Sequence, residues 1–175
     1  MTKTLYVAGP MYGIPQYNFP LFEAVAVALR NDGYTIVSPH ECDSEETRKA
    51  AWASPDGKHN PDAASESWGE CLARDVKMLA DGTYIADERG VTGNWPTTID
   101  GIAFLPNWDK SKGARLEAFV GLLTGKEFFR VVVDHRDPSA PDGAYSYMLE
   151  AVTAEYVQFM LAAPWAEAIR MHTPL

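Results

Sequence analysis

The sequence has few cysteines and histidines, and none of them has the spacing of metal ligands. The 175 residues include two cysteines, Cys42 and Cys71, and four histidines that form no H-x-x-x-H pair. A zinc site therefore has little support, and we expect neither a metal nor another cofactor. We expect both thiols to be reduced, because structural disulfides are rare in the cytosol.

The sequence also lacks a long uninterrupted apolar run. A membrane-spanning helix needs about 18 or more consecutive apolar residues, and no segment approaches that length. The opening stretch "MTKTLYVAGP" has no charged leader followed by a long apolar core. We therefore expect a cytoplasmic protein that makes no contact with a membrane.

Positive charge is scarce. Fifteen lysines and arginines face 24 aspartates and glutamates, which gives a net charge of −9. Such a chain repels the phosphate backbone, so we do not expect a nucleic-acid polymer as a partner. A small anion can still bind, since the backbone N–H groups at the start of one helix suffice for a phosphate.

The remaining pattern alternates strands with helices. The chain is long enough for one domain with its own core, and 46% of its residues are hydrophobic. We predict one doubly wound α/β domain of the flavodoxin or Rossmann kind, with a mostly parallel sheet and ligand sites at the carboxyl ends of the strands. The predicted strands are residues 3–10, 34–39, 101–106 and 127–134, and the predicted helices are 19–31, 67–82, a helix that carries Glu117 between the third and fourth strands, and 144–162.

Apolar spacing predicts which face of each helix is buried. Asn18 is the expected N-cap of the first helix, and Asp32-Gly33 is its expected end. Residues 43–66 and 81–98 look like insertions, the first partly helical and the second with a short strand at 83–86, and residues 144–175 form a C-terminal helical extension. The predicted buried positions are Phe22, Val25, Ala26 and Leu29; Trp68, Leu72, Val76 and Leu79; Leu116, Phe119, Val120 and Leu123; and Tyr145, Met148, Leu149, Val152 and Tyr156.

Three places can carry chemistry, and the first is the loop "AGPMYG" after the first strand. Gly9 and Gly13 flank a proline and leave backbone N–H groups unshielded, which suits a phosphate or a sugar hydroxyl. The loop matches neither G-x-x-x-x-G-K-[ST] nor G-x-G-x-x-G, so it indicates neither ATP nor a dinucleotide. A tight turn without a ligand explains the same residues equally well.

The second place is Asp75, which falls inside the apolar stripe of its helix, three residues after Leu72 and four before Leu79. A buried carboxylate is costly unless it is paired or reaches a polar cleft. An ion pair with Arg74 or Lys77 is the simpler explanation, and a functional carboxylate is the alternative.

The third place is the start of the helix that carries Glu117. Asp109 or Ser111 can cap this helix, and Gly113 in its first turn bares the N-terminal amides to an anion. Small residues next to Glu117 leave room for a ligand against its carboxylate. Most glutamates on helices are nevertheless solvated, so the spacing alone leaves both readings open.

Several stretches together resemble one known family. "LYVAGPMYGIPQYNFPLF", "GYTIVSPHE", "ARDVKML" and "DGIAFLPNWDKSKGARLEAF" look like a phage-associated, uncharacterised branch of the nucleoside 2-deoxyribosyltransferase superfamily. Characterised relatives are nucleoside deoxyribosyltransferases and deoxynucleoside 5′-monophosphate N-glycosidases. The resemblance covers roughly residues 4–133, interrupted at 43–66 and 81–98.

The resemblance implies a site. Glu117 corresponds to the family's nucleophile, and Asp75 corresponds to a carboxylate that contacts the sugar and base. Asp109 corresponds to a second carboxylate of the transferases, while Ser111 and Gly113 correspond to the 5′-phosphate contacts of the phosphate-preferring members. Where those members often carry a basic residue in the first loop, this chain has Met11-Tyr12. The implied substrate-binding set is Tyr6, Gly9, Pro10, Met11, Tyr12, Gly13, Asn18, Trp108, Asp109, Ser111 and Gly113.

The function implied first is hydrolysis of a (deoxy)nucleoside 5′-monophosphate to free base and (deoxy)ribose 5-phosphate. Base exchange by the same covalent intermediate is the second possibility, and a non-catalytic nucleotide-binding protein is the third. The family also implies a homodimer or a higher homo-oligomer. The sequence leaves open the base, the sugar and the role of residues 81–98. Four aromatic residues could stack on a base, although packing explains each of them better: Tyr12, Tyr17, Trp95 and Trp108.

Overall fold

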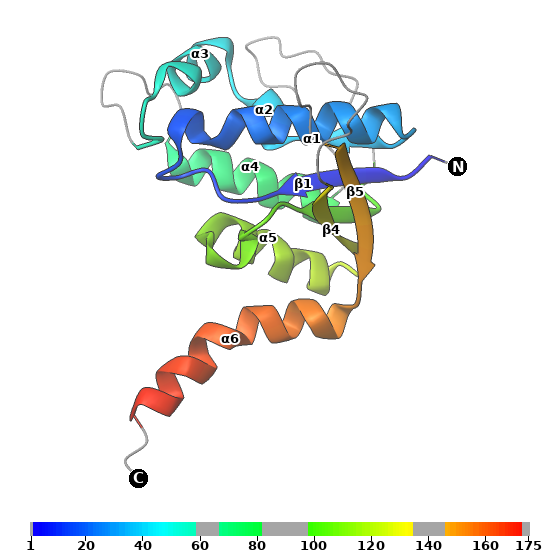
Figure 1. Cartoon of the computed structure of the whole chain (residues 1–175), viewed down its shortest axis with the longest axis vertical. Helices are drawn as coiled ribbons and strands as arrows, with labels where there is room; N and C mark the ends of the chain where they lie inside the picture. The colour runs from blue at the N-terminus through cyan, green and yellow to red at the C-terminus, as the bar shows by residue number, and fades with distance from the viewer. Residues whose placement is uncertain (1, 59–66, 82–97, 135–145, 173–175) are drawn as a thin grey trace.

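The structure is a computed structural model that describes residues 2–58, 67–81, 98–134 and 146–172, with side chains to residue 133 in the third range and to residue 163 in the fourth. A five-stranded sheet in the order β2-β1-β3-β4-β5 lies at its centre (Figure 1). The strands are β1 (Thr4–Ala8), β2 (Thr35–Val37), β3 (Gly101–Phe104), β4 (Glu127–Asp134) and β5 (Ser146–Val152).

The first four strands are parallel. Tyr6 of β1 lies opposite Val37 of β2 and Ile102 of β3, and β3 pairs with β4 in the same direction. All five residues of β1 are buried, as expected for a central parallel strand that helices cover on both faces. The predicted mostly parallel, doubly wound α/β fold is confirmed.

Helices lie on both faces of the sheet. Helix α1 (Phe19–Asn31) buries Phe22, Val25, Ala26 and Leu29 against one face, as predicted from its apolar spacing. Helices α4 (Trp68–Asp81), α5 (Lys112–Leu123) and α6 (Ala154–His172) contribute to a second core on the other face. Short elements complete the described chain: η1 (Pro15–Asn18), α2 (Pro39–Cys42), α3 (Glu45–Ala53) and η2 (Trp108–Lys110).

The predicted helix over residues 144–162 is wrong in its first half. Residues 146–152 form β5, which runs antiparallel to β4 with Leu149 opposite Val131. The segment "SYMLEAV" alternates in exposure, so an apolar stripe at helical spacing also fits an edge strand. Helix α6 starts only after Thr153, whose hydroxyl oxygen accepts a hydrogen bond from the Tyr156 N–H at 3.2 Å.

The predicted buried face of α5 is wrong for three of its four residues. Leu116, Phe119 and Leu123 are 38%, 51% and 71% exposed, whereas Val120 is half-buried and packs against the core. The face toward the sheet carries small residues instead, namely Ala114, Ala118 and Gly121, together with Glu117. A Cβ on Gly121 would lie 2.6 Å from the Ile102 side chain, so a larger face could not come this close to β3.

Helix α4 departs from its predicted face in the same way. Trp68 is 67% exposed and Leu72 and Val76 are half-buried, so only Leu79 of the predicted set is buried, beside Met78 and Asp75. The first predicted insertion is helical in its first half, where Ser44 caps α3 by accepting a hydrogen bond from the Thr47 N–H. The rest of that insertion from residue 59, and residues 82–97 of the second with the strand expected at 83–86, lie outside the described residues.

None of the helices that the structure describes has the length and apolar character needed to span a lipid bilayer.

Candidate functional site

A buried hydrogen bond joins the first strand to the fifth helix. The Tyr6 hydroxyl donates to Oε1 of Glu117 at 2.7 Å. Tyr6 is fully buried and Glu117 is only 5% exposed. The solvated alternative for Glu117 is therefore excluded, because this carboxylate is held inside the protein by a side chain from the central strand.

The small face of α5 places Glu117 there. Glu117 lies on the same side of the helix as Ala114, Ala118 and Gly121, all of which are buried against the sheet. Because these residues add little bulk, the helix packs close to the sheet and the glutamate side chain enters the space beside Tyr6. Small residues thus allow α5 to lie close to the sheet, whereas the large apolar residues Leu116, Phe119 and Leu123 of this helix face outward.

Asp75 of α4 is the second buried carboxylate, with 7% exposure. Its Oδ1 accepts a hydrogen bond from Nε of Arg74 at 3.3 Å, and Nη2 of Arg74 binds Asp43 at 2.8 Å. Nη1 of Arg74 also donates to the Cys42 carbonyl. The ion pair expected as the simpler explanation is present, but Asp75 also interacts electrostatically with Glu117.

The two carboxylates influence each other's protonation. Burial raises the pKa of Glu117 well above its ordinary value, and repulsion from Asp75 adds to the rise, while the Tyr6 hydrogen bond opposes it. Burial also raises the pKa of Asp75, against the effect of Arg74. Two interacting buried acids titrate as a pair, so near neutral pH one of them can be protonated beside an ionised partner.

The glycines of the loop after β1 are needed for packing and for the turn, and one of the amides that the sequence predicts to be unshielded is already hydrogen-bonded. Gly9 has no room for a Cβ, which would lie 2.7 Å from Leu105. Gly13 adopts a φ of +79°, and its N–H donates to the Gly57 carbonyl at 2.9 Å. The prediction of unshielded amides is therefore wrong for Gly13. Tyr12 is 73% exposed at the tip of this loop.

The other loop residues support the turn. Pro10 and Met11 are half-buried, and the Pro10 carbonyl accepts a hydrogen bond from Nδ2 of Asn18 at 2.9 Å. Asn18 stands at the start of α1 but makes no capping hydrogen bond with its side chain, so its predicted N-cap role is wrong in that respect. Its side chain ties the loop to the helix instead.

The start of α5 matches one of the two predicted caps. The Ser111 hydroxyl oxygen accepts from the Ala114 N–H at 3.3 Å, whereas Asp109 uses its backbone carbonyl to accept from Arg115. A Cβ on Gly113 would meet only the Ser111 hydroxyl, at 4.0 Å, so space lies open above this turn. Trp108 is 4% exposed and stacks on Phe104 with ring centroids 4.2 Å apart, which makes it a core residue.

The structure thus brings Tyr6, Asp75 and Glu117 together, with the β1 loop and the start of α5 at the same carboxyl edge of the sheet. The sequence predicts Arg74 as a possible partner of Asp75, and the structure shows that it also links Asp75 to Asp43. Sequence reasoning missed one residue that supports the β1 loop. Gly57 packs on the β1 loop, since a Cβ there would lie 1.8 Å from the Ile14 carbonyl oxygen, and the "PDG" turn signal around it could have identified it.

Metal ligands do not gather in the described ranges: no group of three or more histidine, cysteine, aspartate or glutamate side chains there could hold an ion.

Comparison with known proteins gives one finding. Residues 3–54 match a family described as "Domain of unknown function (DUF4406)". The match includes Tyr6, the loop 9–13 and Asn18, and it ends before Asp75 and Glu117. No curated protein matches the chain.

Proposed function

We propose that this protein is an N-glycosidase that hydrolyses a (deoxy)nucleoside 5′-monophosphate, releasing the free base and (deoxy)ribose 5-phosphate. The observation that carries the proposal is the buried Tyr6–Glu117 hydrogen bond beside Asp75, which supplies two carboxylates with raised pKa values. The β1 loop and the segment that leads into α5 follow the carboxyl ends of β1 and β3, at the carboxyl edge of the sheet. Ligands of doubly wound folds bind at this edge. The resemblance to the nucleoside 2-deoxyribosyltransferase superfamily supplies the substrate class.

Glu117 is the proposed nucleophile. Breaking an N-glycosidic bond develops positive charge at the anomeric carbon, which a nearby carboxylate stabilises and can capture as a glycosyl ester. Tyr6 occupies Oε1 of Glu117, so Oε2 is the oxygen that forms the bond to the sugar. Water then attacks the anomeric carbon and passes its proton to the Asp75 carboxylate, so that the sugar phosphate leaves, Glu117 is ionised again and Asp75 is reprotonated.

Asp75 is the proposed acid. The departing base must gain a proton, and the carboxyl pair holds one near neutral pH. Glu117 has the higher pKa of the two, so the proton must pass from Glu117 to Asp75, both of which interact with the Tyr6 hydroxyl, before Asp75 gives it to the base and the ionised Glu117 attacks. Arg74 then stabilises the Asp75 carboxylate that results, through the contact at 3.3 Å.

The start of α5 is the proposed place for the 5′-phosphate. The first amides of a helix have no acceptor within the helix, and an anion there is favoured by the helix dipole. Open space above Gly113 and the Ser111 hydroxyl supports this assignment. The phosphate and the carboxylate pair would then hold opposite ends of one sugar.

Release of free base from a panel of nucleoside monophosphates, followed by chromatography, tests the activity. We expect Glu117→Gln to lower turnover by roughly a thousandfold or more, because the amide cannot form the glycosyl ester. Glu23→Gln, on the exposed side of α1, is the matched control and should keep full activity. Undiminished turnover by Glu117→Gln would remove this residue from the mechanism, and tight nucleotide binding without any turnover would favour the non-catalytic alternative.

A deoxyribosyltransferase is the second candidate, favoured by the burial of Glu117. A carboxylate that is 5% exposed limits the access of water to a glycosyl ester, which leaves time for a second base to attack. Incubation of a donor with a different free base distinguishes the two activities, because only a transferase forms a new nucleoside or nucleotide.

A further inference from the structure

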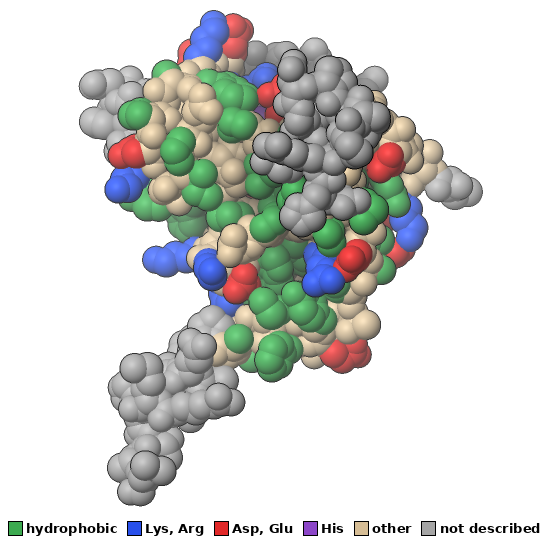
Figure 2. Space-filling model, in the orientation of Figure 1, with side chains coloured by type: hydrophobic (Ala, Val, Ile, Leu, Met, Phe, Trp, Pro, Cys, Tyr) green, Lys and Arg blue, Asp and Glu red, His purple; other side chains and the backbone are tan. Residues whose placement is uncertain are grey.

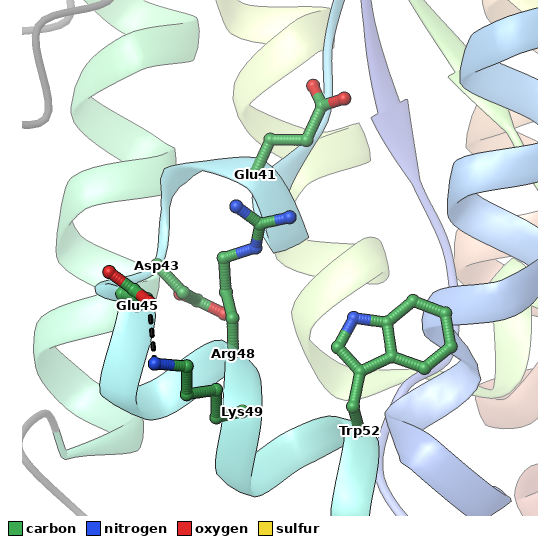
Figure 3. Close-up of a pocket in the computed structure, with 6 residues that line it drawn as sticks. All are labelled: Glu41, Asp43, Glu45, Arg48, Lys49 and Trp52. Carbon is green, nitrogen blue, oxygen red and sulfur yellow. Dashed lines mark ion pairs between the residues drawn. The ribbon is translucent and has the colours of Figure 1, made fainter.

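A pocket of about 430 Å³ is lined by residues of α2, of α3 and of the short segment between them, which follow β2 in the chain (Figure 3). It is separate from the pair formed by Asp75 and Glu117. Neither Glu117 nor Asp75 lines it. Its walls combine five charged side chains with one indole: Glu41, Asp43, Glu45, Arg48, Lys49 and Trp52.

The three carboxylates of the pocket are each neutralised by a cation. Arg30 donates to both oxygens of Glu41, at 2.8 and 2.6 Å. Arg74 binds Asp43 at 2.8 Å, and Lys49 binds Glu45 at 2.6 Å. The acidic residues therefore leave little uncompensated negative charge in the pocket.

Arg48 is the charged side chain of the pocket that takes no part in these ion pairs. Among the residues that the structure describes, its guanidinium makes no ion pair, and Figure 3 shows its side chain extending from α3 toward α2, between Asp43 and Trp52 in that view. A guanidinium offers five donors in a planar fork that matches a carboxylate or a phosphate.

Trp52 supplies an aromatic wall. Its ring is half-buried and meets the Phe19 ring edge-on, with centroids 6.0 Å apart and planes at 83°. This contact fixes the indole at the rim, where a flat ring can stack on its remaining surface.

We propose that the pocket binds a planar organic anion, with its ring against Trp52 and its anionic group on the Arg48 guanidinium. Binding of this anion does not require the N-glycosidase activity, because neither Tyr6, Asp75 nor Glu117 lines the pocket. Phenyl phosphate is a suitable probe: it combines a flat ring with a phosphate and has no N-glycosidic bond to cleave.

Titration of the ¹⁵N-labelled protein with phenyl phosphate, followed through the indole N–H signals, tests the proposal. A Trp52→Phe variant assigns the Trp52 signal. We expect that signal to shift saturably, and Arg48→Met to weaken binding by about tenfold or more, since a charge-assisted bidentate contact is lost. Lys49→Met is the matched control, because it removes the neighbouring charge that Glu45 already holds, and it should weaken binding by less than about threefold.

Three results would overturn the proposal: no saturable shift at Trp52, equal weakening by Arg48→Met and Lys49→Met, or binding of inorganic phosphate as tight as that of phenyl phosphate. A Glu117→Gln variant should bind the probe like the wild type. Absence of nucleotide hydrolysis with intact probe binding would thus contradict only the proposed enzyme activity. Absence of probe binding with intact hydrolysis would contradict only the proposed anion pocket.

Discussion

At the scale of single residues, the burial of Glu117 is costly and needs an explanation. A carboxylate inside a protein costs free energy unless it is paired or protonated, and the hydrogen bond from Tyr6 compensates only part of that cost. Residues that lower stability while providing chemistry are typical of active sites. The same side chain should therefore have opposite effects on stability and on activity.

We predict that Glu117→Gln stabilises the protein, increasingly with pH. The pKa of Glu117 is higher in the folded than in the unfolded chain, so its protonated form stabilises the fold at low pH. That stabilisation is lost as pH rises from about 4.5 toward the raised value, and a glutamine avoids the loss because it stays neutral. The gain should reach about 1–3 kcal/mol above neutral pH, measured by urea unfolding across a pH series.

Glu23→Gln provides the comparison for this series and should leave stability nearly unchanged at every pH, since Glu23 is exposed. A lower free energy of unfolding for Glu117→Gln than for the wild type at pH 8 would contradict the assignment of Glu117 as a buried acid with a raised pKa.

At the scale of elements, Arg115 fastens α6 to α5. Its Nη2 donates to the Leu161 carbonyl at 2.6 Å, and its Nη1 lies 3.4 Å from the Met160 carbonyl and 3.2 Å from that of Asp109. Pro164 has no N–H, so the Met160 carbonyl has no partner at the usual position one turn further along α6. The Arg115 guanidinium donates the hydrogen bond to the Met160 carbonyl that Pro164 cannot donate. Arg115 lies two residues before Glu117 on α5.

We predict that Arg115→Met destabilises the protein by about 1–3 kcal/mol, because it removes three hydrogen bonds and leaves the Met160 carbonyl without a donor. Chemical denaturation measures the loss. Arg130→Met serves as control: Arg130 pairs with Glu150 on the surface, and such a pair contributes about 0–1 kcal/mol. Equal effects of the two variants would mean that Arg115 makes no more than a surface contact.

At the scale of the whole molecule, α5 and α6 leave an apolar surface without cover. Phe119 and Leu123 of α5 and Phe159 of α6 are 51%, 71% and 69% exposed, and Figure 2 shows apolar side chains gathered where these helices meet. The first turns of α6 pack against α5, whereas its C-terminal part extends away from the sheet and the other helices (Figure 1). Exposed apolar clusters of this kind mark protein–protein contacts. A second copy of the chain is the proposed occupant, consistent with the homo-oligomer that the resemblance implies.

We predict a dimer by light scattering, and a monomer after Phe119→Asp combined with Phe159→Asp, because two charges would have to be buried in the interface. Val27→Asp is the control. Val27 is also 51% exposed but belongs to α1, on the other face of the sheet, so the variant should stay dimeric. A monomeric wild type, or dissociation by Val27→Asp, would contradict this interface.

The sequence by itself determined the four parallel strands and α1. Short buried apolar runs that end at Gly or Pro predicted β1, β2, β3 and β4 correctly, and one apolar stripe at helical spacing predicted the buried face of α1. These signals are local, so they can be recognised without knowing which distant residues pack against them. The βαβ arrangement followed from the lengths of these segments.

Only the tertiary structure decided the rest. Residues 146–152 fit a helix and a strand equally well, and the free edge of β4 selected the strand. On α5, Gly121 lies so close to Ile102 and Phe128 that it leaves no room for a Cβ there. The large apolar residues face outward, and Glu117 lies on the inner face among small residues. The local sequence specified the glutamate, but the distance between α5 and β3 placed it against Tyr6.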